Sequence, residues 1–189
     1  MGKASSFLLL LSLFYIAHNA KSATTTTDFI KSSCSSARYP NLCVSSLSSY
    51  ASKIQQSPHK MAQAALAVSH SNSQSLKVFV SNLNKSKGLK KIEYGALKDC
   101  LEVIDDCKDQ ISQSIQELKL IGEKKGKDFS FHLSNVQTWV SSAITDLNTC
   151  LDGFEEKAME GKVKTSITPK VTNVLQLTSN ALALCNKLA

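Results

Sequence analysis

The sequence predicts an all-α protein: an antiparallel, up-and-down four-helix bundle preceded by an N-terminal helical hairpin and stapled by disulfides. Glycine, proline and aromatic residues are few among the 189 residues, which favours helices over a β-sandwich or barrel. Apolar residues recur at helical spacing in four long segments. Short or moderate connections join these segments, as expected for helices that pack as antiparallel neighbours.

Residues 1–23 are interpreted as a secretory signal peptide. Lys3 precedes a short apolar run over residues 7–17, and small residues follow as far as Ala23. This order is typical of a removable leader, and the run is shorter than the roughly 20 residues that cross a bilayer. We therefore expect residues 24–189 to form one secreted domain that does not enter a membrane, in an oxidising compartment where cysteines pair.

The N-terminal hairpin is expected over residues 24–57. A short helical turn comes first, Pro40 marks a break, and residues 41–53 carry apolar side chains at helical spacing. Cys34 and Cys43 flank the break, so a bridge between them would staple the hairpin.

Residues 58–189 are expected to supply the four bundle helices. The first opens at Ser57, a capping residue followed by a proline suited to the first helical position, and ends near Gly88. The second runs from about Lys90 to Ile121 and stops at a glycine.

The third and fourth helices are placed by similar local features. Ser134, with Gln137 three residues later, predicts a capping box at the start of the third helix. Thr168 and Pro169 predict the start of the fourth. Each helix needs its apolar stripe buried against the others, because none would be stable alone.

Six cysteines allow many pairings, and the sequence alone does not choose among them. Spacing favours a local Cys34–Cys43 pair. Cys100 lies in the second long helix and Cys150 at the end of the third, so a bridge between these neighbouring helices would close a loop of about 50 residues.

Cys107 and Cys185 lie on core-facing stripes of their helices. We expect buried free thiols there, each acting as a small hydrophobic residue. A third bridge between them is the alternative. No histidine and acid are positioned to activate either thiol, which argues against a catalytic cysteine.

Several classes of function lack the residues that they need. There is no Cys-x-x-Cys, no histidine pair with ligand spacing and no glycine-rich phosphate loop, so we expect no metal, no cofactor and no enzymatic activity. The net charge of +7 comes mostly from loop lysines without interleaved aromatics, which disfavours nucleic-acid binding. Asn84 begins an Asn-Lys-Ser sequon for possible N-glycosylation.

One acidic stripe is the main candidate binding feature. Glu102, Asp106 and Asp109 follow i, i+4, i+7 spacing and fall on one face, turned away from the core. An ordinary solvated face and a recognition stripe both fit this pattern. The stripe does not place two unequal carboxylates in a pocket, so it does not predict a glycosidase-like acid and base.

Six segments, in this order, resemble a known family. They are residues 28–34 (DFIKSSC), 38–43 (RYPNLC), 96–102 (ALKDCLE), 139–145 (WVSSAIT), 149–154 (TCLDGF) and 177–184 (LTSNALAL). Together they resemble the plant invertase and pectin methylesterase inhibitors, and the match covers essentially all of residues 24–189.

The resemblance implies a hairpin followed by a four-helix bundle, with bridges Cys34–Cys43 and Cys100–Cys150. It implies a non-enzymatic protein of the cell wall, or apoplast, that binds its target enzyme one to one. Cys107 and Cys185 fall outside the family's four-cysteine pattern, so their state stays open.

The resemblance also implies where the target binds. In the pectin methylesterase branch, bundle helices cover the pectin cleft of the enzyme. Acidic residues after the third family cysteine, and one after the fourth, lie at that contact. The matching positions here are Glu102, Asp106, Asp109 and Asp152.

The branch is predicted from two short segments. Residues 150–154 (CLDGF) resemble the pectin methylesterase side, whereas residues 169–171 (PKV) depart from the Pro-Lys-Phe of many invertase inhibitors. The chain also ends where a fused catalytic domain would begin, so we expect a free-standing inhibitor of pectin methylesterase. The alternatives are an inhibitor of cell-wall or vacuolar invertase and a secreted structural or chaperone-like bundle.

Overall fold

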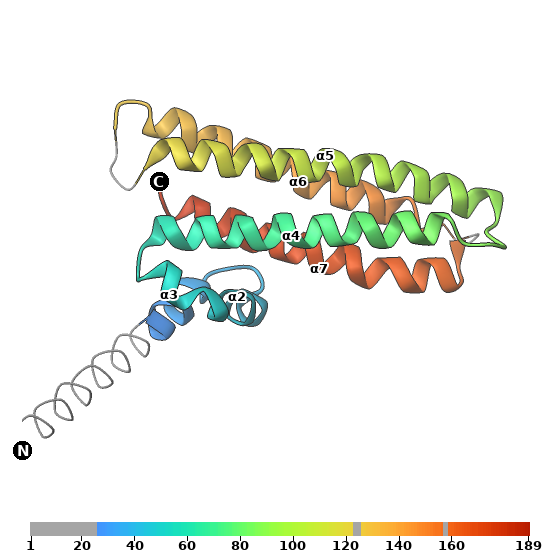
Figure 1. Cartoon of the computed structure of the whole chain (residues 1–189), viewed down its shortest axis with the longest axis horizontal. Coiled ribbons are helices and arrows are strands. Elements are labelled where there is room, and N and C mark those ends of the chain that lie inside the picture. The colour runs from blue at the N-terminus through green and yellow to red at the C-terminus, as the bar shows by residue number, and fades with distance from the viewer. Residues whose placement is uncertain (1–25, 123–125, 157–158) are drawn as a thin grey trace, which may run out of the picture.

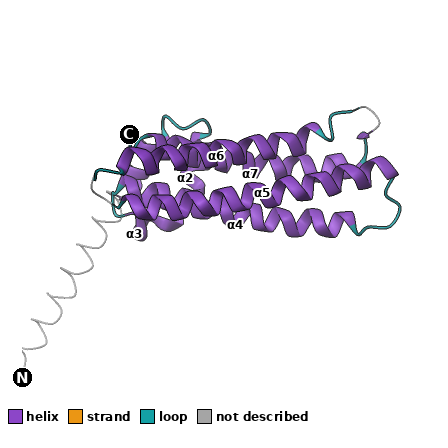
Figure 2. Ribbon diagram, turned by 90° about the horizontal axis from the view of Figure 1, so that it is seen from above, coloured by secondary structure: helices purple, strands orange, loops and turns teal. Residues whose placement is uncertain are grey.

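The computed structural model describes residues 26–122, 126–156 and 159–189. Four long helices run alternately up and down to form an elongated bundle (Figures 1 and 2). They are α4 (Pro58–Asn84), α5 (Lys91–Ile121), α6 (Phe129–Asp152) and α7 (Lys162–Asn186). Each packs on two neighbours in the cyclic order α4, α5, α6, α7, and α5 and α6 share the longest interface. The predicted antiparallel four-helix bundle is confirmed, whereas the predicted signal peptide lies outside the described residues.

The hairpin packs against the side of the bundle formed by α4 and α7, near one end of the bundle (Figure 1). Residues 26–34 are helical, and the second arm consists of α2 (Pro40–Leu47), a 3₁₀ turn η1 (Ser48–Tyr50) and α3 (Ala51–Ile54). The arms are joined by the Cys34–Cys43 disulfide, with 5.7 Å between the two Cα atoms. The apolar side chains of the hairpin pack against α4 and α7, so the hairpin extends the hydrophobic core.

The starts and ends of the first two long helices follow the predicted local chemistry. The Ser57 hydroxyl oxygen accepts a hydrogen bond from the Lys60 backbone N–H at 3.2 Å, which caps α4 as expected. Helix α5 ends at Ile121, and Gly122 adopts φ of +65° just beyond it. That left-handed φ favours glycine.

The predicted start of the third helix is wrong. Helix α6 begins at Phe129, five residues before Ser134. Gln137 forms no capping box: its amide donates instead to the Asn186 side chain at 2.9 Å. Phe129 and the buried Leu133 pack on the core, so burial extends this helix beyond the local capping pattern.

The predicted start of the fourth helix is also wrong. Helix α7 begins at Lys162 and contains Pro169 in its interior. A proline there removes the backbone hydrogen bond to the carbonyl of Thr165. Val163 and Ile167, which precede the proline, are buried in the core, and their burial stabilises the helical turns that the proline weakens.

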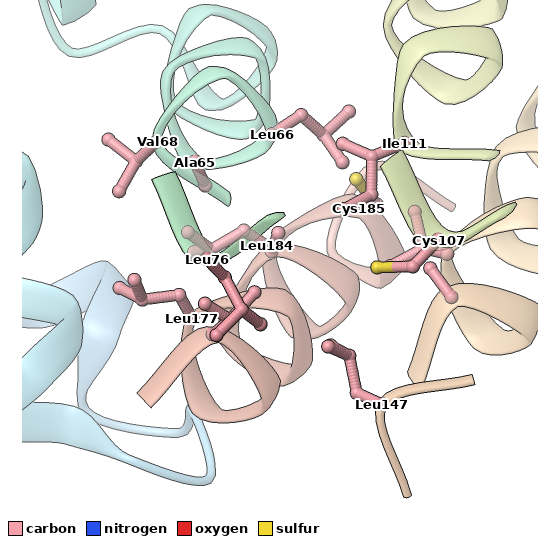
Figure 3. Packing of buried hydrophobic residues seen from close by; sticks show 14 of the residues in the cluster. Ala65, Leu66, Val68, Leu76, Cys107, Ile111, Leu147, Leu177, Leu184 and Cys185 are labelled. Atoms are coloured by element: carbon pink, nitrogen blue, oxygen red, sulfur yellow. The ribbon is translucent and has the colours of Figure 1, made fainter. Parts of the chain in front are cut away.

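The two remaining cysteines lie inside the bundle. Cys107 and Cys185 are free and fully buried, as predicted, and the alternative third bridge does not form. Figure 3 shows their side chains among core residues that include Leu66, Ile111 and Leu147. Burial raises the pKa of each thiol to about 12, so both are uncharged hydrophobic fillers at physiological pH.

The second disulfide joins α5 to α6. Cys100 and Cys150 are bridged, with 4.5 Å between their Cα atoms and 50 residues between them in sequence. Both pairs favoured by the spacing are therefore present. Over the described part of the chain, no helix is long and apolar enough to cross a membrane.

Candidate protein-docking surface

The predicted acidic stripe lies on the outer side of α5. Glu102, Asp106 and Asp109 are all exposed, because their helical spacing turns them away from the buried face of α5. Asp152 is exposed at the end of α6. Three of the four predicted residues thus share the outer side of α5, and the fourth lies at the exposed end of α6 beyond the bridge to α5. We call the surface formed by α5 and α6 around these residues the docking face.

The Cys100–Cys150 bridge holds two of these acids at positions close to each other along the bundle. Glu102 and Asp152 each follow a bridged cysteine by two residues. Since α5 and α6 are antiparallel, the two acids lie on opposite sides of the bridge along the bundle axis. Asp106 and Asp109 continue the stripe from Glu102 toward the hairpin end.

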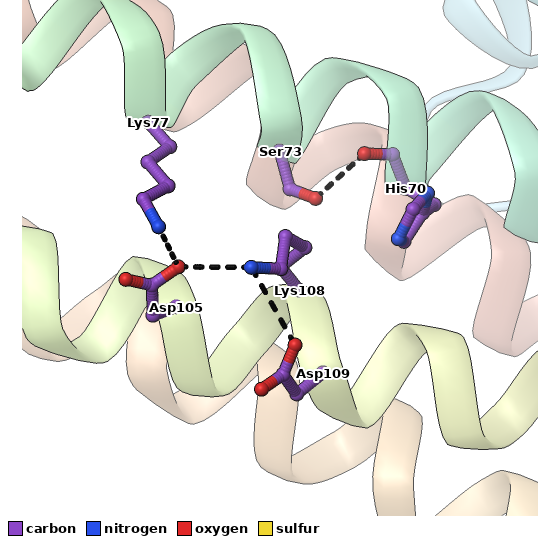
Figure 4. Close-up of polar contacts among 6 residues, drawn as sticks. All are labelled: His70, Ser73, Lys77, Asp105, Lys108 and Asp109. Carbon is purple, nitrogen blue, oxygen red and sulfur yellow. Dashed lines mark hydrogen bonds and ion pairs between the residues drawn. The ribbon is translucent and has the colours of Figure 1, made fainter.

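Only part of the stripe is neutralised by lysines. Lys108 lies 3.5 Å from Asp109 and 3.0 Å from Asp105, and Asp105 also binds Lys77 of α4 at 2.6 Å (Figure 4). Burial opposes ionisation of Asp105, but hydrogen bonds from both lysines lower the pKa of this carboxyl below its ordinary value. Asp105 thus belongs to the α4–α5 contact and not to the docking face.

Glu102 and Asp106 make no ion pair with any residue that the structure describes. Their charges are therefore available to a partner. An exposed carboxylate gains most when a partner removes it from water and supplies a matching cation.

Asp146 on α6 is a residue of this surface that the sequence analysis missed. It is half-buried, and its pKa is raised by burial and by the charge of Asp106, against a hydrogen bond from Gln110. Asp146 Oδ2 and Gln110 Oε1 are both buried without a partner in the described structure. Asp146 and Gln110 lie in the interface between α5 and α6, below the exposed carboxylates of the stripe. Nothing in the local sequence marks Asp146, because its environment depends on the packing of α6 against α5.

A groove of about 350 Å³ continues the docking face toward the end of the bundle away from the hairpin. It runs beside the interhelical disulfide and combines an apolar floor with acidic edges. Its lining is made of Ile92, Gly95, Ala96, Asp99, Cys100, Val103, Thr149, Cys150, Gly153 and Glu156. Such a groove suits a basic or aromatic side chain of a protein partner.

Two glycines keep this groove open. A side chain at Gly95 would meet no atom within 4 Å, and one at Gly153 would meet only backbone oxygens. A larger side chain at either position would extend into this space. Gly95, before Cys100, and Gly153, after Cys150, are the sequence feature that could have pointed to the groove.

Asn84, the predicted glycosylation position, is the last residue of α4 and is half-buried. Its Oδ1 atom is buried without a hydrogen-bond partner in the described structure. The sequon therefore lies at a helix end and not in a fully exposed loop.

The described residues bring together no group of three or more His, Cys, Asp or Glu side chains that could hold a metal ion. The docking face combines a rigid acidic ridge on α5 with a neighbouring apolar groove. The class defined by this fold and this surface is a small, disulfide-bridged helical binding protein.

Comparison with known proteins gives the family. The model of the plant invertase/pectin methylesterase inhibitor family matches residues 28–184. The chain belongs to this family, as the six segments of its sequence indicated.

Several relatives match over nearly their whole length. The chain is 46% identical over 187 residues to the 21 kDa protein of Daucus carota, covering 99% of this chain and 97% of the relative. It is 45% identical over 188 residues to Pectinesterase inhibitor 11 of Arabidopsis thaliana, covering 97% and 93%. Pectinesterase inhibitor 9 of the same plant is 45% identical over 193 residues, covering 99% and 95%.

A solved structure supports the fold. The crystal structure of a mutant form of a pectin methylesterase inhibitor from Arabidopsis matches with a TM-score of 0.65. The match covers 81% of this chain and 92% of the other at 16% sequence identity, and it therefore speaks to the fold alone.

Proposed function

We propose that the protein is an inhibitor of pectin methylesterase, and not itself an enzyme, and that it acts by binding the esterase in a one-to-one complex. Its family includes inhibitors of two enzymes. The relatives that match nearly the whole chain at 45% identity are named pectinesterase inhibitors, which favours the esterase over invertase. In the complex, the docking face covers the pectin-binding cleft of the esterase and excludes the polysaccharide.

The observation that supports the mode of binding is the exposed acidic ridge on α5, in which Asp109 is paired with Lys108 while Glu102 and Asp106 make no ion pair with a described residue. Pectin itself carries carboxylates, so a cleft that binds it is expected to present groups that complement negative charge. The stripe from Glu102 to Asp109 extends about 10 Å along a rigid helix. A ridge of this length and charge can occupy the positions that polysaccharide carboxylates would take.

The net positive charge does not help this encounter: without residues 1–23, which contain Lys3 and Lys21, the formal charge falls from +7 to +5 (20 basic against 15 acidic residues). A basic esterase would be weakly repelled at long range, and salt screens that repulsion beyond about 10 Å. Complementarity must therefore come from the local carboxylates Glu102, Asp106, Asp109 and Asp152, together with the groove beside the disulfide.

We place the protein in the cell wall, or apoplast, after secretion. The predicted leader at residues 1–23 and the two disulfides support this location, because structural disulfides persist in oxidising compartments. The location also gives the inhibitor access to an esterase that acts on wall pectin.

The experiment that tests the function is a side-by-side titration. The oxidised protein is added to one pectin methylesterase and one acid invertase at mildly acidic pH. We expect stoichiometric loss of esterase activity only. Loss of invertase activity alone would contradict the proposed branch of the family, and an effect on neither enzyme would favour a structural or chaperone-like role.

A further inference from the structure

We propose that the bundle carries a second binding site: a pocket for a uronate unit of an acidic polysaccharide, at the end opposite the hairpin. There the connection between α4 and α5 meets the segment that leads into α7 (Figure 1). The two segments, with the start of α5, line a half-open pocket of about 400 Å³, which lies within the size range of small-ligand pockets. We call it the end cavity.

The lining of the end cavity has the mixed character of a sugar site. Apolar side chains can face the C–H surface of a sugar ring, and hydroxyl and ammonium groups can reach its polar edge. The lining residues that we use are Leu83, Ser86, Lys87, Val163, Lys162 and Ser166.

A buried carboxylate also lines the end cavity. Glu93 is only 6% exposed, and its Oε2 accepts a hydrogen bond from the Lys90 backbone N–H at 2.7 Å. Gly161 adopts φ of +150°, and a Cβ there would lie 4.0 Å from Glu93 Oε1. The glycine therefore leaves open the space beside this oxygen. A carboxylate oxygen in that position can accept a hydrogen bond from a hydroxyl group of a ligand.

The basic residues of the lining favour an anionic ligand. Lys87, Lys90 and Lys162 line the cavity. Of the two acids in its lining, Glu160 is paired with Lys164 at 2.7 Å. Lys87 and Lys162 are exposed and make no ion pair with any described residue. A carboxylate on the ligand would supply a matching anion.

Glu93 favours a sugar acid over a simple anion. Phosphate and sulfate carry several acceptor oxygens and negative charge, so a neighbouring carboxylate repels them. A uronate offers both kinds of group: a carboxylate for Lys87 and Lys162, and hydroxyl donors for Glu93. This combination identifies the ligand class.

The end cavity is separate from the four predicted acids of the docking face. Its lining comes from the α4–α5 connection and from the start of α7, and binding of a saccharide needs no esterase. The inference therefore does not rest on the proposed inhibition. A protein with both sites could hold on to wall pectin while its α5–α6 face binds the enzyme.

The test is a titration followed by NMR. The oxidised, ¹⁵N-labelled protein is titrated with trigalacturonate, with its methyl ester, with neutral galactotriose and with inorganic phosphate. We expect saturable amide shifts over residues 83–93 and 160–166 with trigalacturonate only. Equal shifts with phosphate would reduce the site to a simple anion site, and shifts elsewhere, or none, would overturn the proposal.

Lysine variants distinguish binding in the end cavity from non-specific attraction to the positive surface. The double variant Lys87→Ala, Lys162→Ala is expected to bind trigalacturonate about tenfold more weakly, from the loss of two exposed charge contacts. The matched control Lys31→Ala, Lys119→Ala removes two exposed lysines from other parts of the surface and should bind as the parent does. Equal weakening by both variants would contradict a specific site.

A neutral variant tests the cavity itself. Ser166→Leu places a larger side chain in the lining of the end cavity without changing the charge. If trigalacturonate occupies the cavity, this variant should also bind it more weakly. Thermal unfolding of each variant verifies that the bundle is intact. Esterase inhibition, measured on the same proteins, is expected to stay unchanged, so the two proposals can fail independently.

Discussion

The side chain of Asn180 on α7 binds both backbone groups of Tyr39 in the hairpin. Its Oδ1 accepts from the Tyr39 N–H at 3.0 Å, and its Nδ2 donates to the Tyr39 carbonyl at 2.9 Å. Tyr39 is the N-cap residue of α2, so its carbonyl accepts a hydrogen bond from the Cys43 N–H at 2.9 Å, whereas its own N–H has no partner within the helix. The buried Asn180 side chain pairs the Tyr39 N–H, adds a second donor to the carbonyl, and so connects the hairpin to the bundle.

Replacing Asn180 should weaken the contact between α7 and the hairpin and lower the stability of the fold. Asn180→Leu removes two hydrogen bonds and leaves the Tyr39 N–H unpaired, while the Tyr39 carbonyl keeps the Cys43 N–H as a donor. The free energy of unfolding should therefore fall by about 1–3 kcal/mol. Urea unfolding measures the change. Asn173→Leu, on the exposed side of the same helix, is the matched control and should change stability by about 0.5 kcal/mol or less. Similar losses in both variants would contradict the role given to Asn180.

Charge reversal on the acidic stripe should weaken inhibition. The variant Asp106→Lys, Asp109→Lys turns two attractive contacts with the esterase into repulsive ones, so we expect inhibition to weaken about tenfold or more. Esterase assays at several inhibitor concentrations measure the apparent affinity, and circular dichroism verifies the helical fold.

A second double variant separates local contact from net charge. Asp28→Lys, Asp128→Lys makes the same change in total charge at two exposed acids outside α5. It should inhibit nearly as well as the parent. If it loses as much affinity as the stripe variant, long-range repulsion explains the effect and the docking face is misassigned.

The raised pKa of Asp146 predicts that the stability of the fold depends on pH. Burial and the charge of Asp106 raise the pKa of Asp146 in the folded protein. The folded state thus holds this proton to higher pH than the unfolded state does, and stability falls as pH rises from the ordinary carboxyl pKa of 3.8 through the raised value. Asp146→Asn removes the titration and can donate to Gln110 Oε1.

The measurement is chemical unfolding of parent and Asp146→Asn across the acidic range. We expect the two proteins to differ least below the ordinary carboxyl pKa, and the variant to become relatively more stable as pH rises. Asp152→Asn, at an exposed carboxyl, serves as the control. Parallel stability curves for parent and Asp146→Asn would show that Asp146 ionises as freely in the folded state as in the unfolded chain.

The sequence predicted those features that depend on periodicity. Helical spacing placed Glu102, Asp106 and Asp109 on the solvent side of α5 and put Cys107 in the core, because each position is fixed by its angle around one helix. The two disulfides follow from the same reasoning, since they join elements that the topology makes neighbours.

Features that depend on packing between helices could not be predicted in the same way. The helix starts at Ser134 and Pro169 were wrong because burial of Leu133 and Ile167 outweighs a local cap or proline. The raised pKa of Asp146 likewise depends on what α5 presents to α6. A single sequence contains these residues but not the distances between them.

The buried thiols should be unreactive in the folded protein. A thiolate is the reactive form of cysteine, and Cys107 and Cys185 are fully buried with pKa values raised to about 12. A chromogenic disulfide reagent should detect no thiol in the native state and two free thiols in denaturant. Reaction of either thiol without unfolding would show that the core opens locally at that helix.

The two disulfides should differ in how much they stabilise the fold. Chain-entropy arguments give about 4 kcal/mol for the Cys100–Cys150 loop and about 2.5–3 kcal/mol for the shorter Cys34–Cys43 loop, because the bridged residues lie 50 and 9 positions apart. Urea unfolding of the two serine double variants, Cys100→Ser with Cys150→Ser and Cys34→Ser with Cys43→Ser, tests the order. A larger loss from the hairpin pair would mean that its bridge acts mainly through folded-state contacts with α4 and α7. Loss of the α5–α6 bridge should also weaken esterase inhibition, because Cys100 and Cys150 line the groove of the docking face.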